Sequence, residues 1–262
     1  CVHLSGMPCD IKSIVKLCKK HNLRLIEDCA QSHGSKYNGF YTGSFGDIST
    51  WSFCTDKIIS TGGEGGMIST NNIKYYKKLW SLKDHGKNYD KFFSKNRPNK
   101  FSYIHDFLGS NYRMTEIQAI LGRIQLANLD LNIKKRQKNA SIINNFLVNI
   151  KNIYLPLNNK LYYNSFYKYY IIINKKKLKS KISTQNIIDA IREKNIPCSS
   201  GSCSEIYLEK PFKKYQKTRL QNASRLNQSS ICLEIHHKIK RNELISSSKI
   251  IRKILKECIY QN

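Results

Sequence analysis

Two stretches of sequence decide the fold of the first half of this chain: LRLIED at residues 23–28 and ISTWSFCTDK at residues 48–57. Each contains an apolar run of strand length, and the first run, residues 23–26, predicts a buried strand that closes on Asp28. The second run is followed by Lys57. Ligand-binding groups in open α/β sheets gather at the carboxyl ends of strands, so the pattern places Asp28 and Lys57 near such an edge.

Strand and helix signals alternate through residues 1 to about 80. Asp10 is suited to cap a helix, because apolar side chains follow it at the i, i+3, i+4 and i+7 spacing. These side chains are Ile11, Ile14, Val15 and Cys18. Residues 67–70 predict a return strand. The alternation predicts an α/β domain over residues 1–130, with a mostly parallel sheet flanked by helices.

The rest of the chain predicts a loop, a long helix and a second domain. Residues 84–111 are polar, aromatic and irregular, which is typical of a functional loop. From Thr115 a helical pattern begins, and residues 131–155 form a connecting helix. One helix face after Thr115 carries Ile117, Ile120, Leu121 and Ile124. Residues 156–262, with a strand signal at 167–173, predict a small α+β domain.

The net charge of +27 comes from 45 Lys and Arg residues against 18 Asp and Glu residues. Such a balance is compatible with nucleic-acid binding, but the basic runs carry no interleaved aromatic residues and no known nucleic-acid motif. The apolar runs are far shorter than the roughly 18 residues that a membrane span needs, and no signal peptide is recognisable. We therefore expect a cytoplasmic protein that binds neither nucleic acid nor membrane.

The nine cysteines show no C-x-x-C pair, and the spacing nearest to a ligand pair is Cys198 to Cys203. Zinc sites usually show paired ligands at short spacing. We therefore expect free thiols in a reducing cytoplasm and no metal site.

The chemistry of Asp28 and Lys57 suits pyridoxal 5'-phosphate (PLP). A lysine forms a Schiff base with the cofactor aldehyde, and a carboxylate keeps the pyridine nitrogen protonated so that the ring acts as an electron sink. Gln31 is placed to donate to the ring oxygen, and the Ser52 hydroxyl suits a phosphate oxygen. The glycine cluster at residues 62–66 permits close approach to a ligand. The simpler interpretation, that Asp28 only caps a turn, remains open.

Three ordered motifs carry a resemblance to a known family. They are IEDCAQSHGSKYNG at residues 26–39, GSFGDISTWSFCTDKIISTGGEGGMIST at residues 43–70 and GSNYRMTEIQAILGRIQL at residues 109–126. They resemble the DegT/StrS family of PLP-dependent nucleotide-sugar aminotransferases, and the similarity is continuous from Val2 to about Arg136.

The resemblance implies a fold-type-I PLP-dependent transferase and assigns roles to single residues. Asp28 would pair with the pyridine nitrogen, Gln31 would contact the ring oxygen, and Ser52 would bind the phosphate. Lys57 would be the catalytic lysine that forms the Schiff base. Asn111 would reach the cofactor phosphate of the neighbouring subunit in a homodimer.

The resemblance also implies a substrate class. Amino transfer, with glutamate as donor, would act on a keto-sugar linked to a nucleotide, in surface or secondary-metabolite sugar biosynthesis. His33 lies inside the cofactor motif, and Arg113 and His236 match family residues near the site, so we expect these three near the substrate. Residues 197–205 would face the sugar nucleotide or form a plain loop.

Three alternatives stay open. The chain opens with Cys1, and family members usually carry about 110–120 further residues before this point, a size that suits a complete cofactor domain. We therefore expect an N-terminally truncated member, which admits a non-catalytic remnant or regulator. A sugar dehydratase on the same scaffold would carry histidine where this chain has Lys57. A basic nucleic-acid-binding module is the third alternative.

Overall fold

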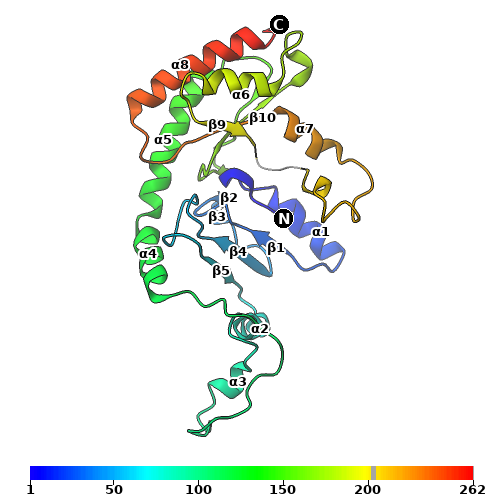
Figure 1. The fold of residues 1–262 in the computed structure, drawn as a ribbon, viewed down its shortest axis with the longest axis vertical. Coiled ribbons are helices and arrows are strands. Elements are labelled where there is room, and N and C mark those ends of the chain that lie inside the picture. The colour runs from blue at the N-terminus through cyan, green and yellow to red at the C-terminus, as the bar shows by residue number, and fades with distance from the viewer. Residues whose placement is uncertain (202–204, 262) are drawn as a thin grey trace. The chain divides into compact units, whose positions relative to one another are not determined.

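The computed structural model describes residues 1–201 and 205–261 (Figure 1). The chain divides into two compact units, which we describe separately. The first unit comprises Cys1–Leu4 and Pro8–Leu129, and the second comprises Ser5–Met7 and Asp130–Asn262.

A three-stranded sheet organises the first unit, with strand order β1-β4-β5. β1 (Ile26–Asp28) and β4 (Ile48–Ser52) are parallel, and Asp28 lies opposite Thr50. β5 (Gly66–Ser69) pairs with β4 in the antiparallel direction, as a return strand. The carboxyl ends of β1 and β4 therefore lie at the same edge of the sheet.

β1 begins later than the sequence predicted. The apolar run at residues 23–26 enters the strand only at Ile26, and of its residues only Leu25 is buried. Leu25 is held by Asp47 instead of by a strand ladder: its N–H donates to Asp47 Oδ2 at 2.8 Å, and its carbonyl accepts from the Asp47 N–H at 2.8 Å. Val2 extends the sheet through a parallel bridge to Asp28.

The first helix, α1 (Ile11–Lys20), begins where the sequence predicted. Asp10 caps it, because its side chain accepts a hydrogen bond from the Ser13 N–H. Ile11, the first apolar residue of the predicted face, is fully buried.

A hairpin follows β1, formed by β2 (Lys36–Tyr37) and β3 (Phe40–Tyr41). Its two-residue turn consists of Asn38 at φ 49° and Gly39 at φ 86°. Asn-Gly is favoured at this kind of turn because both positions require positive φ.

The predicted loop at residues 84–111 follows α2 (Ile73–Lys83) and contains one short helix, α3 (Tyr89–Phe92). α4 (Glu116–Ala127) then begins at a capping box, in which the Thr115 hydroxyl and the third helical side chain satisfy each other's backbone N–H groups.

The second unit contains a four-stranded antiparallel sheet with strand order β6-β8-β10-β9. The helices and strands along this part of the chain are α5 (Leu129–Leu147), β6 (Ile153–Tyr154), β7 (Tyr162–Tyr163), β8 (Tyr169–Ile173), α6 (Thr184–Arg192), β9 (Cys198–Ser200), α7 (Gln221–Ser229), β10 (Ser230–Leu233) and α8 (Arg241–Cys258). Short 3₁₀ turns occur at Leu4–Gly6, Lys175–Lys177 and Ile206–Leu208.

Every second side chain along β8 contributes to the hydrophobic core of the second unit. Tyr169, Ile171 and Ile173 point to one face and are buried, as the period of two along a strand requires. They pack in one cluster with apolar side chains of α5, α6 and α8, and Figure 1 shows α6 and α8 side by side. Each fully buried isoleucine contributes about 1.5–3 kcal/mol to folding. Within the described residues, no helix combines the length and apolar character that a membrane span requires.

Candidate active site

Two polar side chains lie at the shared carboxyl edge of β1 and β4. Asp28 ends β1 and Ser52 ends β4. The ladder continues one step past β1, because the Cys29 N–H donates to the Thr50 carbonyl at 2.9 Å. The parallel register therefore fixes both side chains on one edge of the sheet, the usual place for ligand-binding groups in such sheets.

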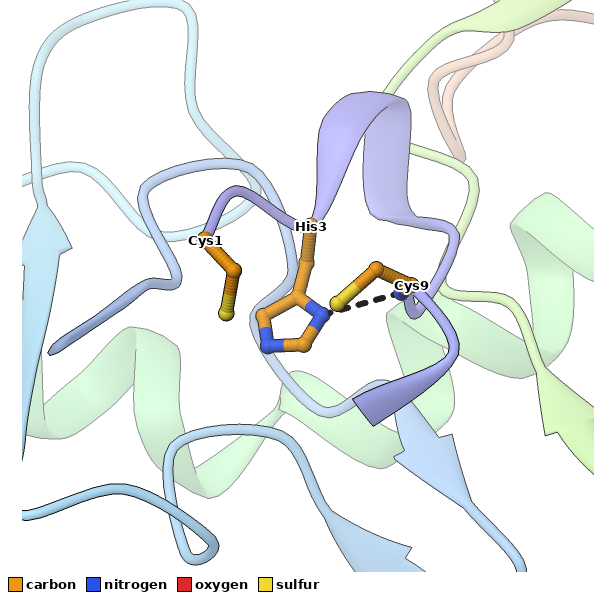
Figure 2. A group of neighbouring side chains, drawn as sticks. All are labelled: Cys1, His3 and Cys9. Carbon is orange, nitrogen blue, oxygen red and sulfur yellow. Dashed lines mark hydrogen bonds between the residues drawn. The ribbon is translucent and has the colours of Figure 1, made fainter. Parts of the chain in front are cut away.

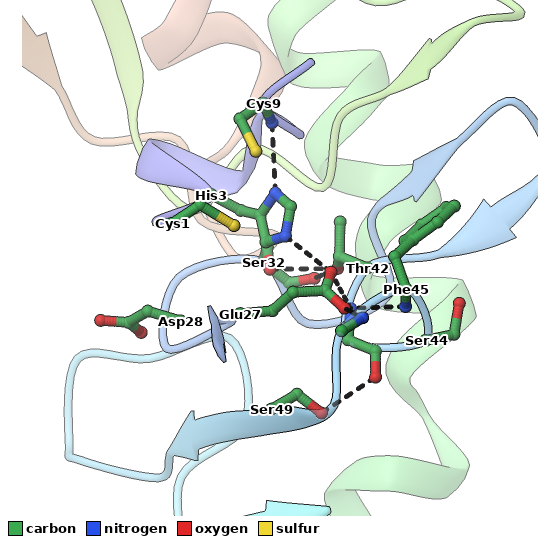
Figure 3. A network of polar contacts seen from close by, with 12 residues as sticks. Cys1, His3, Cys9, Glu27, Asp28, Ser32, Thr42, Ser44, Phe45 and Ser49 are labelled. Carbon is green, nitrogen blue, oxygen red and sulfur yellow. Dashed lines mark hydrogen bonds and ion pairs between the residues drawn. The ribbon is translucent and has the colours of Figure 1, made fainter. Parts of the chain in front are cut away.

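Asp28 points away from its neighbour Glu27, as adjacent residues of a strand must (Figure 3). Asp28 Oδ1 accepts a hydrogen bond from the Ala30 N–H at 3.0 Å, so this carboxylate does cap the turn that follows β1. Its other oxygen, Oδ2, accepts no hydrogen bond from the residues that the structure describes. Turn capping thus occupies one oxygen and leaves the second for a ligand.

Glu27 anchors β1 from the opposite face. It is fully buried, and its carboxylate accepts from the N–H groups of Gly43, Phe45 and Gly46 at 2.8, 2.8 and 2.6 Å and pairs with His3 Nε2 at 3.0 Å. Burial alone would raise the pKa of Glu27, but these hydrogen bonds lower it below its usual value. Sequence reasoning missed this pair, because only the fold brings His3 to Glu27.

Lys57 lies in a closed loop that follows β4. Its side chain is 15% exposed, and its Nζ lies 3.2 Å from Asp56 Oδ1. The loop is closed by hydrogen bonds from Thr61 N–H to the Phe53 carbonyl at 3.1 Å and from Phe53 N–H to the Gly65 carbonyl at 2.7 Å. These bonds return the chain to the end of β4, close to Ser52.

The glycine cluster is required by the backbone of this loop. Gly62 and Gly63 have φ values of 80° and 152°, which side chains other than hydrogen rarely permit. A Cβ atom on Gly65 would lie 2.2 Å from Thr61 Oγ1. The loop that carries Lys57 can therefore close only with glycine at these positions.

One face of α4 holds the same loop. Gln125 both accepts from the Ser60 N–H at 3.0 Å and donates to the Ser60 carbonyl at 2.6 Å, and Gln118 donates to the Glu64 carbonyl at 2.8 Å. The residues of this face are Gln118, Leu121, Gly122 and Gln125, spaced three and four apart. The sequence analysis did not single out the two glutamines, although their spacing of seven residues places them on one face of a helix.

His33 lies beside the ends of β4 and is almost fully buried. Its ring is 5.5 Å from the Trp51 ring and 5.8 Å from the Phe53 ring, and neither ring nitrogen hydrogen-bonds to a described residue. Burial lowers the pKa of His33 to about 4, a backbone group of Ser52 partly offsets this, and the charge of Lys57 lowers it further. A neutral, buried imidazole thus lies near Lys57.

We expect His33 to make folding sensitive to mild acid. The unfolded chain binds a proton near pH 6.5, whereas folded His33 does so only near pH 4. The contribution of neutral His33 to the free energy of unfolding is therefore fully present above about pH 6.5. It falls by about 3 kcal/mol as the pH drops toward 4. Urea unfolding followed by tryptophan fluorescence should show this loss between pH 6.5 and 4.5 in the parent chain, and His33→Phe should remove most of it. The same substitution at exposed His21 is the control, and an unchanged slope in His33→Phe would refute the assignment.

Gln31 is half-buried in the turn after Asp28, and the other predicted site residues lie elsewhere. Asn111 and Arg113 form a separate cluster: Arg113 Nε donates to Asn111 Oδ1 at 3.0 Å and lies 4.0 Å from Asp84 Oδ1. The structure joins these two residues to each other and to the end of α2.

His236 belongs to the second unit. Its carbonyl accepts from Asn139 Nδ2 at 3.1 Å, and its Nδ1 accepts from the Lys238 N–H at 3.3 Å. The predicted sugar-nucleotide segment at residues 197–205 includes residues 202–204, which lie outside the described residues.

Comparison with known proteins places this arrangement in a family. The DegT/DnrJ/EryC1/StrS aminotransferase family matches residues 1–252. An aminotransferase from Psychrobacter cryohalolentis of known structure shares the fold with a TM-score of 0.92 and 37% identity, over 98% of this chain and 68% of that one. The predicted α/β transferase fold is thereby confirmed.

Two curated relatives extend the comparison. GDP-perosamine synthase of Escherichia coli O157:H7 is 46% identical over 142 residues, which are 54% of this chain and 36% of the relative. UDP-N-acetyl-3-dehydro-alpha-D-glucosamine 3-aminotransferase of Acidithiobacillus ferrooxidans is 30% identical over 97% of this chain and 63% of the relative. The chain thus spans one to two thirds of the length of these relatives. It belongs to the DegT/DnrJ/EryC1/StrS aminotransferase family.

Proposed function

We propose that the protein transfers an amino group from glutamate to a ketone on a nucleotide-linked sugar, with PLP as cofactor. The observation that carries this proposal is the joint placement of Asp28 and Ser52 at the ends of adjacent parallel strands, with Lys57 on the loop that returns to them. The names of the two curated relatives, one a perosamine synthase and one a sugar aminotransferase, support the substrate class.

The side chains at this edge fit the cofactor chemically. PLP has an aldehyde, a ring nitrogen and a phosphate, which call for an amine, a carboxylate and a hydroxyl donor. Lys57, Asp28 and Ser52 supply these groups, and Asp28 keeps one oxygen without a described partner. His33 adds two buried ring nitrogens that make no hydrogen bond of standard geometry to the described residues, as expected where a polar ligand completes a site.

Each residue then has a distinct task. When bound, PLP supplies an electron sink for the negative charge that develops at the donor carbon. Lys57 would hold the cofactor until the amino donor displaces it, and its freed Nζ would then take a proton from the α-carbon of glutamate and later deliver one to the sugar carbon that receives nitrogen. The Asp28 carboxylate orients the ring and keeps its nitrogen protonated. The Ser52 hydroxyl binds a phosphate oxygen.

A turnover assay on the whole protein tests the proposal. With PLP, glutamate and keto-sugars linked to GDP, UDP or dTDP, we expect equal amounts of 2-oxoglutarate and amino-sugar, each dependent on both substrates. Loss of water from the sugar without nitrogen uptake would identify a dehydratase instead. Cofactor binding with no turnover on any of these sugars would favour the non-catalytic alternative.

We also propose that the protein works as a homodimer that buries the outer face of α4. One face of α4 holds the Lys57 loop, whereas Ile117, Ile120 and Ile124 on another face are 73%, 56% and 57% exposed. An apolar stripe of this kind is typical of a face that another surface covers.

The double substitution Ile117→Glu and Ile124→Glu should dissociate this dimer. In a two-fold dimer each substitution occurs in both subunits, and each buried isoleucine contributes about 1.5–3 kcal/mol to association. The dissociation constant of the dimer should therefore rise at least about 100-fold. Sedimentation velocity measures the change, with Val148→Glu, an exposed apolar residue after α5, as control. A dimer of unchanged affinity in the double variant would exclude this face.

A further inference from the structure

Two thiols and one imidazole meet in the first unit at a place that the proposed reaction does not use. Cys1, His3 and Cys9 each offer one ligand atom, and these atoms lie within 4.8 Å of one another (Figure 2). Cys1 and His3 are two apart on the segment that pairs with β1, so their side chains share a side. Cys9 directly precedes the cap of α1. We propose that Cys1, His3 and Cys9 form a binding site for Zn²⁺.

The hydrogen bonds of His3 assign its tautomer. Its Nε2 lies 3.0 Å from Glu27 Oε2, and its Nδ1 accepts from the Cys9 N–H at 3.1 Å. The proton therefore sits on Nε2 and the lone pair on Nδ1. Metal-binding histidines almost always donate their second ring N–H to a carboxylate or carbonyl, which orients the ring. Glu27, itself fixed by three backbone N–H groups, gives His3 this support.

A neighbouring combination, His3 with Glu27 and Cys29, is a poorer site. Its three residues are all buried, which leaves an ion no route from solvent. The Glu27 carboxylate already takes part in four hydrogen bonds, as many as its lone-pair sites allow. In the proposed site, Cys1 is exposed and Cys9 is half-buried, so an ion can enter.

The ligand set selects the ion. Two thiolates balance the charge of a divalent cation and the imidazole stays neutral, so the filled site carries no net charge. Zn–S bonds of about 2.3 Å and Zn–N bonds of about 2.0 Å put tetrahedral ligand atoms about 3.5–3.8 Å apart. Ligand atoms that now lie within 4.8 Å of one another therefore need to approach by at most about 1.3 Å, and His3 Nδ1 exchanges the Cys9 N–H for the ion. Sulfur ligands exclude Mg²⁺ and Ca²⁺, and three protein ligands leave the fourth position to water.

The site uses the thiol of Cys1 and not its amino group. It ties the segment beside β1 to the start of α1. Sequence reasoning excluded a metal because it sought C-x-x-C pairs, whereas here the ligands are spaced two and six apart.

Cobalt titration of the reduced, chelator-treated full chain tests the site. Tetrahedral Co²⁺–thiolate complexes absorb strongly in the visible and near ultraviolet, and we expect this signal to saturate at one ion per chain and to be displaced by Zn²⁺. Removing an outer partner of a metal ligand costs about 10–100-fold in affinity, so loss of a ligand in Cys9→Ser should cost at least about 100-fold. Cys18→Ser, on α1 outside the cluster, is the matched control and should bind as the parent does.

A second measurement needs no variant and covers the case in which Cys9→Ser fails to fold. Zn²⁺ should slow alkylation of Cys1 and Cys9 by iodoacetamide at least about 10-fold, a conservative bound given the affinity that thiolate ligands provide. Peptide mapping reads each cysteine separately, and Cys18 should react at its original rate. Absence of a thiolate–cobalt band, or equal protection of Cys18, would overturn the proposal.

Discussion

Replacing Lys57 with alanine is expected to abolish amino transfer and the visible absorbance of the bound cofactor. Lys57 supplies both the covalent attachment and the proton shuttle, and proton transfer by a positioned side chain alone contributes about 10²–10⁴-fold in rate. We therefore expect turnover to fall at least about 1000-fold in Lys57→Ala. Steady-state release of 2-oxoglutarate and a visible spectrum of the same sample measure the two losses.

Lys74→Ala is the matched control for this result. Lys74 is exposed on α2, and the chain has many such lysines. The control should keep both absorbance and turnover. If Lys57→Ala also keeps them, another residue carries the cofactor and the assignment of Lys57 is lost.

Replacing Glu27 with glutamine is expected to destabilise the first unit by about 2–6 kcal/mol, because two buried donors lose their acceptor at about 1–3 kcal/mol each. The single amide NH₂ group must face the donors of one carboxylate oxygen, either His3 Nε2–H and the Gly43 N–H or the N–H groups of Phe45 and Gly46. Total stabilities are about 5–15 kcal/mol, so this loss is large. Both tryptophans, Trp51 and Trp80, lie in the first unit, so urea unfolding by fluorescence reports on it directly.

Asp28→Asn is the matched comparison, one residue along the same strand. Among the described residues, the Asp28 side chain makes one hydrogen bond, from the Ala30 N–H, which the asparagine carbonyl oxygen can retain. We expect a stability change below about 1 kcal/mol together with a large loss of turnover, because the ring nitrogen loses its carboxylate. Equal loss of stability in Glu27→Gln and Asp28→Asn would show that the two faces of β1 do not divide these roles.

The local part of the site was predictable from sequence. The strand end at Asp28 and the helix cap at Asp10 both depend on residues close together in the chain. The sequence placed β1 too early, because the apolar pattern at residues 23–26 did not reveal that Leu25 is hydrogen-bonded to Asp47 outside the strand.

Contacts between distant segments were not predictable. His3 meets Glu27 across 24 residues, and Gln125 meets Ser60 across 65. Periodicity determines which face of an element is apolar but not which segment covers it. For the same reason the stripe that includes Ile117 was visible in the sequence, whereas its exposure in the chain was not.

Reductive trapping on the whole protein tests the central assignment most directly. The protein is incubated with PLP, reduced with borohydride and digested, and the modified lysine is located by mass spectrometry. We predict one adduct per chain, on the peptide that contains Lys57, and its loss in Asp28→Asn at low cofactor concentration. Adducts spread over surface lysines, with Lys57 unmodified, would contradict the site described above.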